Sequence, residues 1–305
     1  MMNQMGAALK IAAIGDIHDQ WEPADNEILE RLGVDLVLFV GDFGNEAVGV
    51  VRCITALQLP YAAILGNHDA WYSASDWGRR QAPYDHRHED RVQQQLDLLG
   101  AAHVGYGCRN FPELGISIIG ARPFSWGGPT WRNEGFYRDR YQVTNFAEST
   151  ARIVAAAQTA TCETLIFLGH NGPHGLGDRP EAPCGRDWEP RGGDYGDPDF
   201  AAAIGQTRLA GKRVACAVFG HMHHQLRHRR DRLRERLGTD AAGTVYLNAA
   251  QVPRMIKRAG DRLSNFSLLT LRAGQVESVE LVWADGNGAI ASTETLYQLR
   301  QPATR

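Results

Sequence analysis

Five short polar motifs, each directly after an apolar run, constrain the fold of this chain more than any other feature. The apolar runs are rich in Val, Ile, Leu and Ala, as is typical of strands buried on both faces of a parallel sheet. Ligands of such sheets bind beyond the carboxyl ends of the strands, so we expect the motifs to meet at one edge. The motifs are GDIH (15–18), GDFG (41–44), GNHD (66–69), GHN (169–171) and GHMH (220–223).

The pattern around these motifs predicts strands that alternate with helices. The β-α-β-α-β order at the start predicts right-handed crossovers between parallel strands. A hairpin is expected near the end of the chain, with its turn at Ala273 and Gly274. The expected strands are 9–16, 34–42, 60–69, 115–123, 163–173, 213–223 and 243–253, and the expected helices are 23–33, 45–58, 88–99, 145–160 and 198–210.

The composition fits one domain over residues 1–305, with a large buried core, because 43% of the residues are hydrophobic and 22% are charged. The formal net charge of −3 gives no overall basic surface for nucleic acid. No signal peptide or membrane span is recognised, and the five cysteines form no CxxC motif. We therefore expect a cytoplasmic protein with reduced thiols and no membrane partner. Residues 71–90 and 171–199 are expected to be irregular insertions that shape the rim of an active site.

The residue types in the five motifs predict a metal site. Carboxylate oxygens and imidazole nitrogens, with no cysteine among them, suit divalent ions such as Mn, Fe or Zn. The donors are too many for one ion, but two ions that share a bridging carboxylate would use them and could clamp a phosphoryl group. The candidate ligands are Asp16, His18, Asp42, Asn67, His170, His221 and His223.

The order GDxH, GD, GNHD, GH, GHxH resembles the pattern of the calcineurin-like metallophosphoesterases, and the resemblance extends over residues 9–283. It implies an α/β fold, a four-layer αββα sandwich of two mixed β-sheets flanked by helices. It also implies a dinuclear metal-dependent hydrolase of phosphoesters, either a phosphodiesterase or a phosphomonoesterase, that uses a metal-activated hydroxide. The expected substrate is a phosphorylated small molecule or a nucleotide.

The resemblance also assigns roles to individual residues. Asp16, His18 and His223 match the ligands of the first metal, and Asp42 matches the bridging carboxylate. Asn67, His170 and His221 match the ligands of the second metal. His68 matches the histidine that protonates the leaving oxygen or stabilises the transition state, and Asp69 would orient it or support the loop.

A segment after the last strand of the sheet resembles another part of the family pattern. LNAAQVPR (247–254) is similar to NxGSxxxPR, which would bring Asn248 or Arg254 toward the site. A guanidinium suits phosphate recognition, so Arg254, together with Asn67, is a candidate substrate-binding residue. The alternative for Arg254 is a surface turn with a solvated side chain.

The second motif departs from that of the serine/threonine phosphatases in this superfamily. Those enzymes read GDxVDRG, whereas this chain reads GDFGNEA, with Asn45 in place of the aspartate that orients the histidine. Asp19 also replaces the glycine that usually follows the first motif. These differences argue against a protein phosphatase. The insert at 171–199 resembles one in a cyanobacterial and chloroplast branch of the superfamily. A further alternative is a non-catalytic, metal-stabilised interaction module, although no ligand is missing.

Three other features allow more than one interpretation. The basic run at 227–236 could contact nucleic acid or another polyanion, but a solvated face is the favoured interpretation. Residues 84–91 could hold a third metal, although a solvated helix start is favoured there. Trp71, Tyr72 and Trp77 would either form an apolar wall for the organic part of a substrate or pack the loop. The pattern makes no prediction of the oligomeric state.

Overall fold

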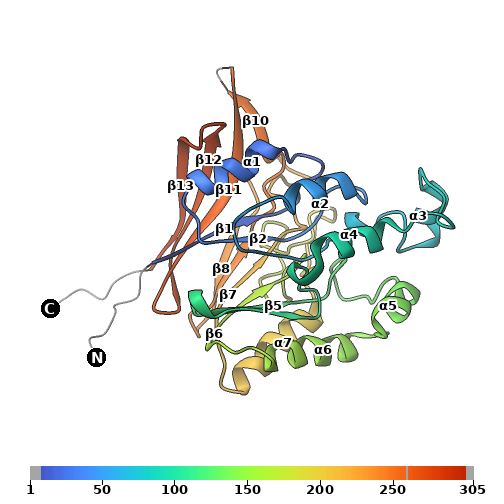
Figure 1. The fold of residues 1–305 in the computed structure, drawn as a ribbon. Helices are drawn as coiled ribbons and strands as arrows, with labels where there is room; N and C mark the ends of the chain where they lie inside the picture. Colours follow the sequence, from blue (N-terminus) through green and yellow to red (C-terminus); the bar gives the residue numbers. More distant parts are fainter. Residues whose placement is uncertain (1–7, 259, 300–305) are drawn as a thin grey trace.

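Two mixed β-sheets pack against each other, with helices on their outer faces, in the computed structural model of the protein (Figure 1). The structure describes residues 8–258 and 260–299. The apolar side chains of the two inner sheet faces form one shared core. This architecture confirms the expected fold class, an α/β protein with two mixed sheets flanked by helices.

The first sheet has the strand order β13-β12-β11-β1-β2-β3, and β10 also pairs with β11. Strands β1, β2 and β3 are parallel to one another, as predicted, so their motifs emerge at the same edge. Strand β11 is antiparallel to β1 and continues through the predicted turn at Ala273 and Gly274 into β12. The strands are β1 (Leu9–Ile14), β2 (Leu36–Phe39), β3 (Tyr61–Ala63), β10 (Met255–Arg258), β11 (Asp261–Arg272), β12 (Gln275–Asp285) and β13 (Ile290–Gln298).

The second sheet has the strand order β4-β5-β6-β7-β9-β8. Its central strands β5, β6, β7 and β9 are parallel, which places the last two motifs at one edge. The outer strands β4 and β8 are antiparallel to their neighbours. The strands are β4 (Cys108–Phe111), β5 (Ile116–Gly120), β6 (Thr164–Leu168), β7 (Arg213–Phe219), β8 (Leu237–Thr239) and β9 (Val245–Asn248).

Amphipathic helices cover both outer faces (Figure 1). The apolar sides of α1, α2 and α4 pack on the first sheet, for example through Leu29, Val51 and Val92. Ile153 of α6 and Phe200 of α7 pack on the second sheet. The helices are α1 (Pro23–Arg31), α2 (Val48–Ile54), α3 (Asp76–Gln81), α4 (Arg91–Leu99), α5 (Glu134–Tyr141), α6 (Phe146–Gln158) and α7 (Pro198–Leu209).

Several elements differ from the prediction, and most of them lie at the edges of the fold. The segment 71–90 is not wholly irregular, because it contains α3 with Ser75 as its N-cap. Helix α2 is shorter than the expected 45–58. Helix α5 and strands β4, β8, β10 and β13 carry weak periodicity and were not predicted. Strand β13, for instance, has mostly exposed side chains, so its sequence shows no buried face.

Candidate metal centre

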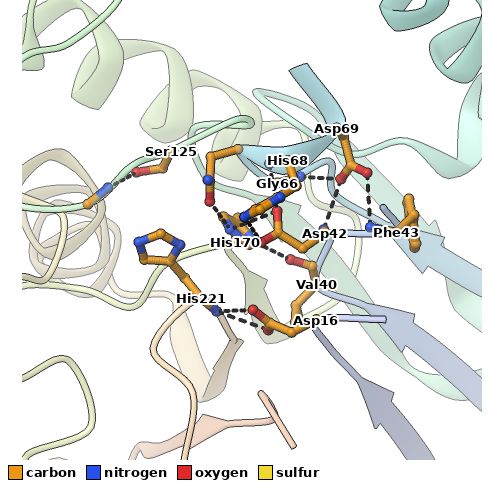
Figure 2. Close-up of polar contacts among 12 residues, drawn as sticks. Asp16, Val40, Asp42, Phe43, Gly66, His68, Asp69, Ser125, His170 and His221 are labelled. Atoms are coloured by element: carbon orange, nitrogen blue, oxygen red, sulfur yellow. Dashed lines mark hydrogen bonds and ion pairs between the residues drawn. The ribbon is translucent and has the colours of Figure 1, made fainter. Parts of the chain in front are cut away.

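The five motif loops meet beyond the carboxyl ends of the parallel strands of both sheets (Figure 2). Backbone hydrogen bonds join the first two motifs: the amides of Asp16 and His18 donate to the carbonyls of Gly41 and Asp42. The second sheet is joined to the first through Nδ1 of His170, which lies 2.8 Å from the carbonyl oxygen of Val40. This last contact connects segments that are more than a hundred residues apart in the chain.

Glycines permit this close approach. A Cβ atom at Gly66 would lie 2.3 Å from Oδ1 of Asp42, and one at Gly220 would lie 2.2 Å from Oδ2 of Asp16. Side chains at these two positions would therefore occupy the space of the candidate ligands. The left-handed backbone is instead adopted by the ligands themselves, with φ values of 51° at Asp16, 54° at Asp42 and 69° at His221. Strained backbone of this kind is concentrated at functional sites.

One group of donors consists of Asp16, His18 and His223, whose ligand atoms lie within 4.8 Å of one another. Nε2 of His223 lies 3.3 Å from Oδ1 of Asp16 and 3.1 Å from Nε2 of His18. This is the set that the resemblance assigns to a first metal. The residues follow β1 and β7, which belong to different sheets.

The second group consists of Asp42, His170 and His221, again within 4.8 Å. Nε2 of His170 lies 3.3 Å from Oδ1 of Asp42 and 2.9 Å from Oδ1 of Asn67, so Asn67 joins the set. Asp42 lies between the two groups, because its Oδ2 is 4.0 Å from Nε2 of His18. The structure thus brings together the seven side chains that were predicted as ligands, with Asp42 between the two groups.

The electrostatics of the cluster suit cations. Burial raises the pKa of Asp42 well above its ordinary value, and the charge of Asp16 adds to this shift. Burial and the neighbouring imidazoles lower the pKa of His221 well below its ordinary value. The neutral imidazole that results is the form that binds a metal.

The facing nitrogens also fit a bound cation. Nε2 of His18 and Nε2 of His223 lie only 3.1 Å apart, so two lone pairs would repel each other unless a proton or a metal ion lay between them. The Nδ1 atom of His170 is occupied by the carbonyl of Val40, which directs the Nε2 lone pair toward Asn67 and Asp42. Nitrogen and oxygen donors without sulfur match ions such as Mn, Fe or Zn.

His68 lies at the edge of this cluster, with its ring fixed on two sides. Its Nδ1 is 2.6 Å from Oδ1 of Asn45, and its Nε2 is 3.9 Å from Oδ2 of Asp42. The indole of Trp71 stacks on the ring at a centroid distance of 4.5 Å. Burial and the imidazoles of His18 and His170 lower the pKa of His68 to about 3.

Asp69 supports the loops and does not contact the His68 ring. Its carboxylate accepts hydrogen bonds from the backbone amides of Asp42, Phe43 and Gly66, at 2.9, 2.9 and 2.6 Å (Figure 2). Of the two roles predicted for Asp69, the geometry matches support of the loop. The orienting contact to His68 comes from Asn45 instead.

Arg254 lies in a buried ion pair with Asp25, which matches neither interpretation of it. The side chain is 1% exposed, so it is not a solvated surface residue. Its guanidinium donates to Oδ1 of Asp25 at 3.2 Å and to the carbonyl oxygen of Gln20, so its contacts are those of a buried structural residue. Asn248 is also structural, since its amide donates to the carbonyls of Pro183 and Met222.

A cavity of about 240 Å³ opens above the donors and is walled by tryptophans. Trp71 lines it and stacks on Trp126 at a centroid distance of 5.4 Å, while Trp188 comes from the 171–199 segment. Trp126 was not predicted, although it follows β5, whose carboxyl end lies at the same sheet edge. Trp77 is 54% exposed and touches the edge of Trp71. Both insertions therefore reach the rim of the cavity.

The remaining predicted candidates lie outside this cavity. Tyr72 packs its ring against Tyr84, in a different part of the surface. Residues 84–91 contain no triad of metal-binding side chains, within the part of the chain that the structure describes. No helix among the described residues is long and apolar enough to span a bilayer.

Comparison with known proteins agrees with this geometry. Residues 9–225 match the family described as calcineurin-like phosphoesterase, and the chain belongs to this family. It is accordingly a metal-dependent phosphoester hydrolase. No curated protein sequence matches the chain significantly.

A solved structure shows the same fold at low sequence identity. The protein TT1561 of Thermus thermophilus superposes with a TM-score of 0.52 at 13% identity, over 92% of this chain and 100% of that chain. A dimetal phosphatase from Danio rerio gives a TM-score of 0.48 at 12% identity, over 95% of this chain and 99% of that chain.

Proposed function

We propose that the protein is a dinuclear enzyme that hydrolyses phosphorylated small molecules or nucleotides, with two divalent ions such as Mn, Fe or Zn. The observation that carries the proposal is the convergence of two donor groups around Asp42. Asp16, His18 and His223 would hold one ion, and Asn67, His170 and His221 the other. When bound, such a pair neutralises phosphoryl oxygens and lowers the pKa of a coordinated water.

In the proposed reaction, a water molecule gives up one proton and its oxygen forms a bond to phosphorus as the P–O ester bond breaks. The leaving oxygen takes a proton and departs as an alcohol. In its protonated form, His68 would supply this proton from Nε2, because its Nδ1–H donates to Oδ1 of Asn45 and Nε2 faces the cluster. The tryptophan wall excludes water and receives the organic part of the substrate.

The test is hydrolysis of p-nitrophenyl phosphate and bis-p-nitrophenyl phosphate by the protein with added Mn. We expect turnover that is lost in Asp42→Ala and after removal of metal with a chelator. The ratio of the two rates assigns the enzyme as a monoesterase or a diesterase. Turnover that persists in both cases would reject the mechanism, and metal binding without turnover on a broad phosphoester panel would favour the interaction module.

A protein phosphatase is the less favoured alternative. The aspartate that would orient the histidine is replaced by Asn45, and the cavity is walled by three tryptophans. Assays with a phosphoserine peptide would address it, and assays with cyclic AMP and single-stranded DNA would test the diesterase subtypes.

A further inference from the structure

The basic segment that follows the GHMH motif divides into structural and free arginines. Arg234 is structural: its buried guanidinium donates to the carbonyls of His223, Ala182 and Gly185. It thereby fixes the 171–199 segment to the loop that carries a candidate ligand. An isolated bridge between Gln225 and Leu233 closes the basic segment into a loop.

Two other arginines of this loop are already neutralised. Arg229 pairs with Glu181 and Asp231, each at 2.7 Å. Arg232 lies 3.8 Å from Glu181 and 3.7 Å from Asp231. These side chains fit the solvated face that the sequence favoured.

Arg227 and Arg230 differ from these two. Within residues 8–258 and 260–299, neither guanidinium has a carboxylate partner in an ion pair. The backbone amide of Arg227 donates to Oδ2 of Asp187 at 2.9 Å, which fixes the position of this residue. Its guanidinium lies 5.7 Å from the centre of the Trp188 ring. Its positive charge therefore stays available at a defined place.

Both arginines line an open groove of about 660 Å³ next to the metal centre. The groove adjoins the tryptophan-walled cavity, because the two spaces share the lining residues His223, Gln225 and Arg227. Among the described residues that line the groove, none is acidic. An unneutralised basic groove beside a phosphoryl-binding centre is suited to a second anionic group of the same substrate.

We propose that Arg227 and Arg230 bind a second phosphate group of the substrate, whose first phosphate is hydrolysed at the metal centre. The natural substrate is then a small molecule with at least two phosphate groups. The inference rests on the proposed function and deepens it. The second phosphate is bound without being transferred, so the reaction remains the hydrolysis of one P–O ester bond.

The test compares substrates that differ by one phosphate, in the Mn-loaded protein. Adenosine 5′-monophosphate is paired with adenosine 3′,5′-bisphosphate for a monoesterase. The p-nitrophenyl ester of thymidine 5′-monophosphate, with and without a 3′-phosphate, serves for a diesterase. We expect the second phosphate to raise kcat/KM at least about tenfold, as one good charge-assisted contact would, and added salt to reduce this advantage.

The variant is Arg227→Gln combined with Arg230→Gln, and the control is Arg152→Gln, an equally exposed arginine on α6. The double variant should reduce the advantage of the second phosphate to less than about twofold, and the control should retain it. The proposal would be overturned if the wild-type enzyme hydrolysed substrates with one phosphate as well as those with two. It would also be overturned if the advantage of the second phosphate survived in the double variant. Faster cleavage of a single-stranded oligonucleotide than of any small molecule would replace it with a nucleic-acid substrate.

Failure of the proposed function gives a different result. In that case the wild-type protein hydrolyses no phosphoester at all, including p-nitrophenyl phosphate. Calorimetry with adenosine 3′,5′-bisphosphate then still tests whether the groove binds a phosphate group. Binding that is lost in the double variant supports it, and binding that is absent or unchanged rejects it.

Discussion

Oδ1 of Asn45 lies 2.6 Å from Nδ1 of His68, so an amide and not a carboxylate orients this ring. The amide fixes the orientation of the ring and carries no charge. It therefore does not offset the lowering of the His68 pKa by burial and by the neighbouring imidazoles. A proton donor with a low pKa is protonated mainly at acid pH, so its contribution to catalysis falls as the pH rises through that pKa.

Asn45→Asp should shift this behaviour to higher pH. A carboxylate beside Nδ1 favours the protonated ring, so the pKa of His68 should rise by about one to three units. The descending limb of the plot of kcat/KM against pH should move to higher pH by the same number of pH units. Asn45→Ala is the control, because it removes the hydrogen bond without adding charge. An unchanged profile in Asn45→Asp would mean that His68 does not act as a proton donor.

Trp71 should matter for catalysis, and Trp77 should not. Trp71 stacks on His68 and lines the cavity, whereas Trp77 lies on the exposed rim. Loss of an aromatic stack of about 1 kcal/mol, together with a less fixed ring, should lower kcat/KM about tenfold in Trp71→Ala. Trp77→Ala should change it less than about twofold. Steady-state kinetics on p-nitrophenyl phosphate check this, and equal effects of the two substitutions would contradict it.

Asp69→Ala should weaken metal binding through the loops. The substitution leaves the amides of Asp42, Phe43 and Gly66 without an acceptor, and each such loss costs about 1–3 kcal/mol. We expect a lower melting temperature and at least about tenfold weaker Mn binding, as for other residues that position ligands. Asp69→Asn should give smaller losses.

A Mn titration of activity separates support from direct catalysis. If Asp69 only positions the loops, saturating Mn should restore most of kcat in Asp69→Asn. A kcat that stays low at saturating Mn, with unchanged stability and Mn affinity, would instead assign Asp69 a direct part in the chemistry.

Arg254→Met should destabilise the protein without weakening substrate binding. The substitution removes one of the two guanidiniums that pair with the buried Asp25, and loss of a partner from a buried pair costs up to about 3–5 kcal/mol. Arg262→Met is the matched control, because Arg262 also pairs with Asp25 but is 30% exposed, so about 1 kcal/mol or less is expected. Denaturant unfolding measures the difference. An increase in KM in Arg254→Met at unchanged stability would restore the substrate-binding role.

The central elements and the ligands could be predicted because their signals are local. Buried parallel strands require continuous apolar runs, and β1, β2, β6 and β7 have them. Gly66 and Gly220 mark the points where the backbone must approach a carboxylate. Edge strands lack such a signal, since β13 is stabilised mainly by hydrogen bonds to β12 and not by a buried face.

The sequence by itself determined which candidate metal ligands this protein carries. It also determined that each of them follows a strand. Only the tertiary structure decided which side chains face the cavity: it placed Arg254 in a buried pair, gave Asn45 the contact to His68, and brought Trp126 and Trp188 to the wall. Among the described residues, it also left Arg227 without a carboxylate partner while it paired Arg229, two residues away. The physical reason is that strand position follows from local patterns, whereas contacts between side chains depend on how distant segments pack.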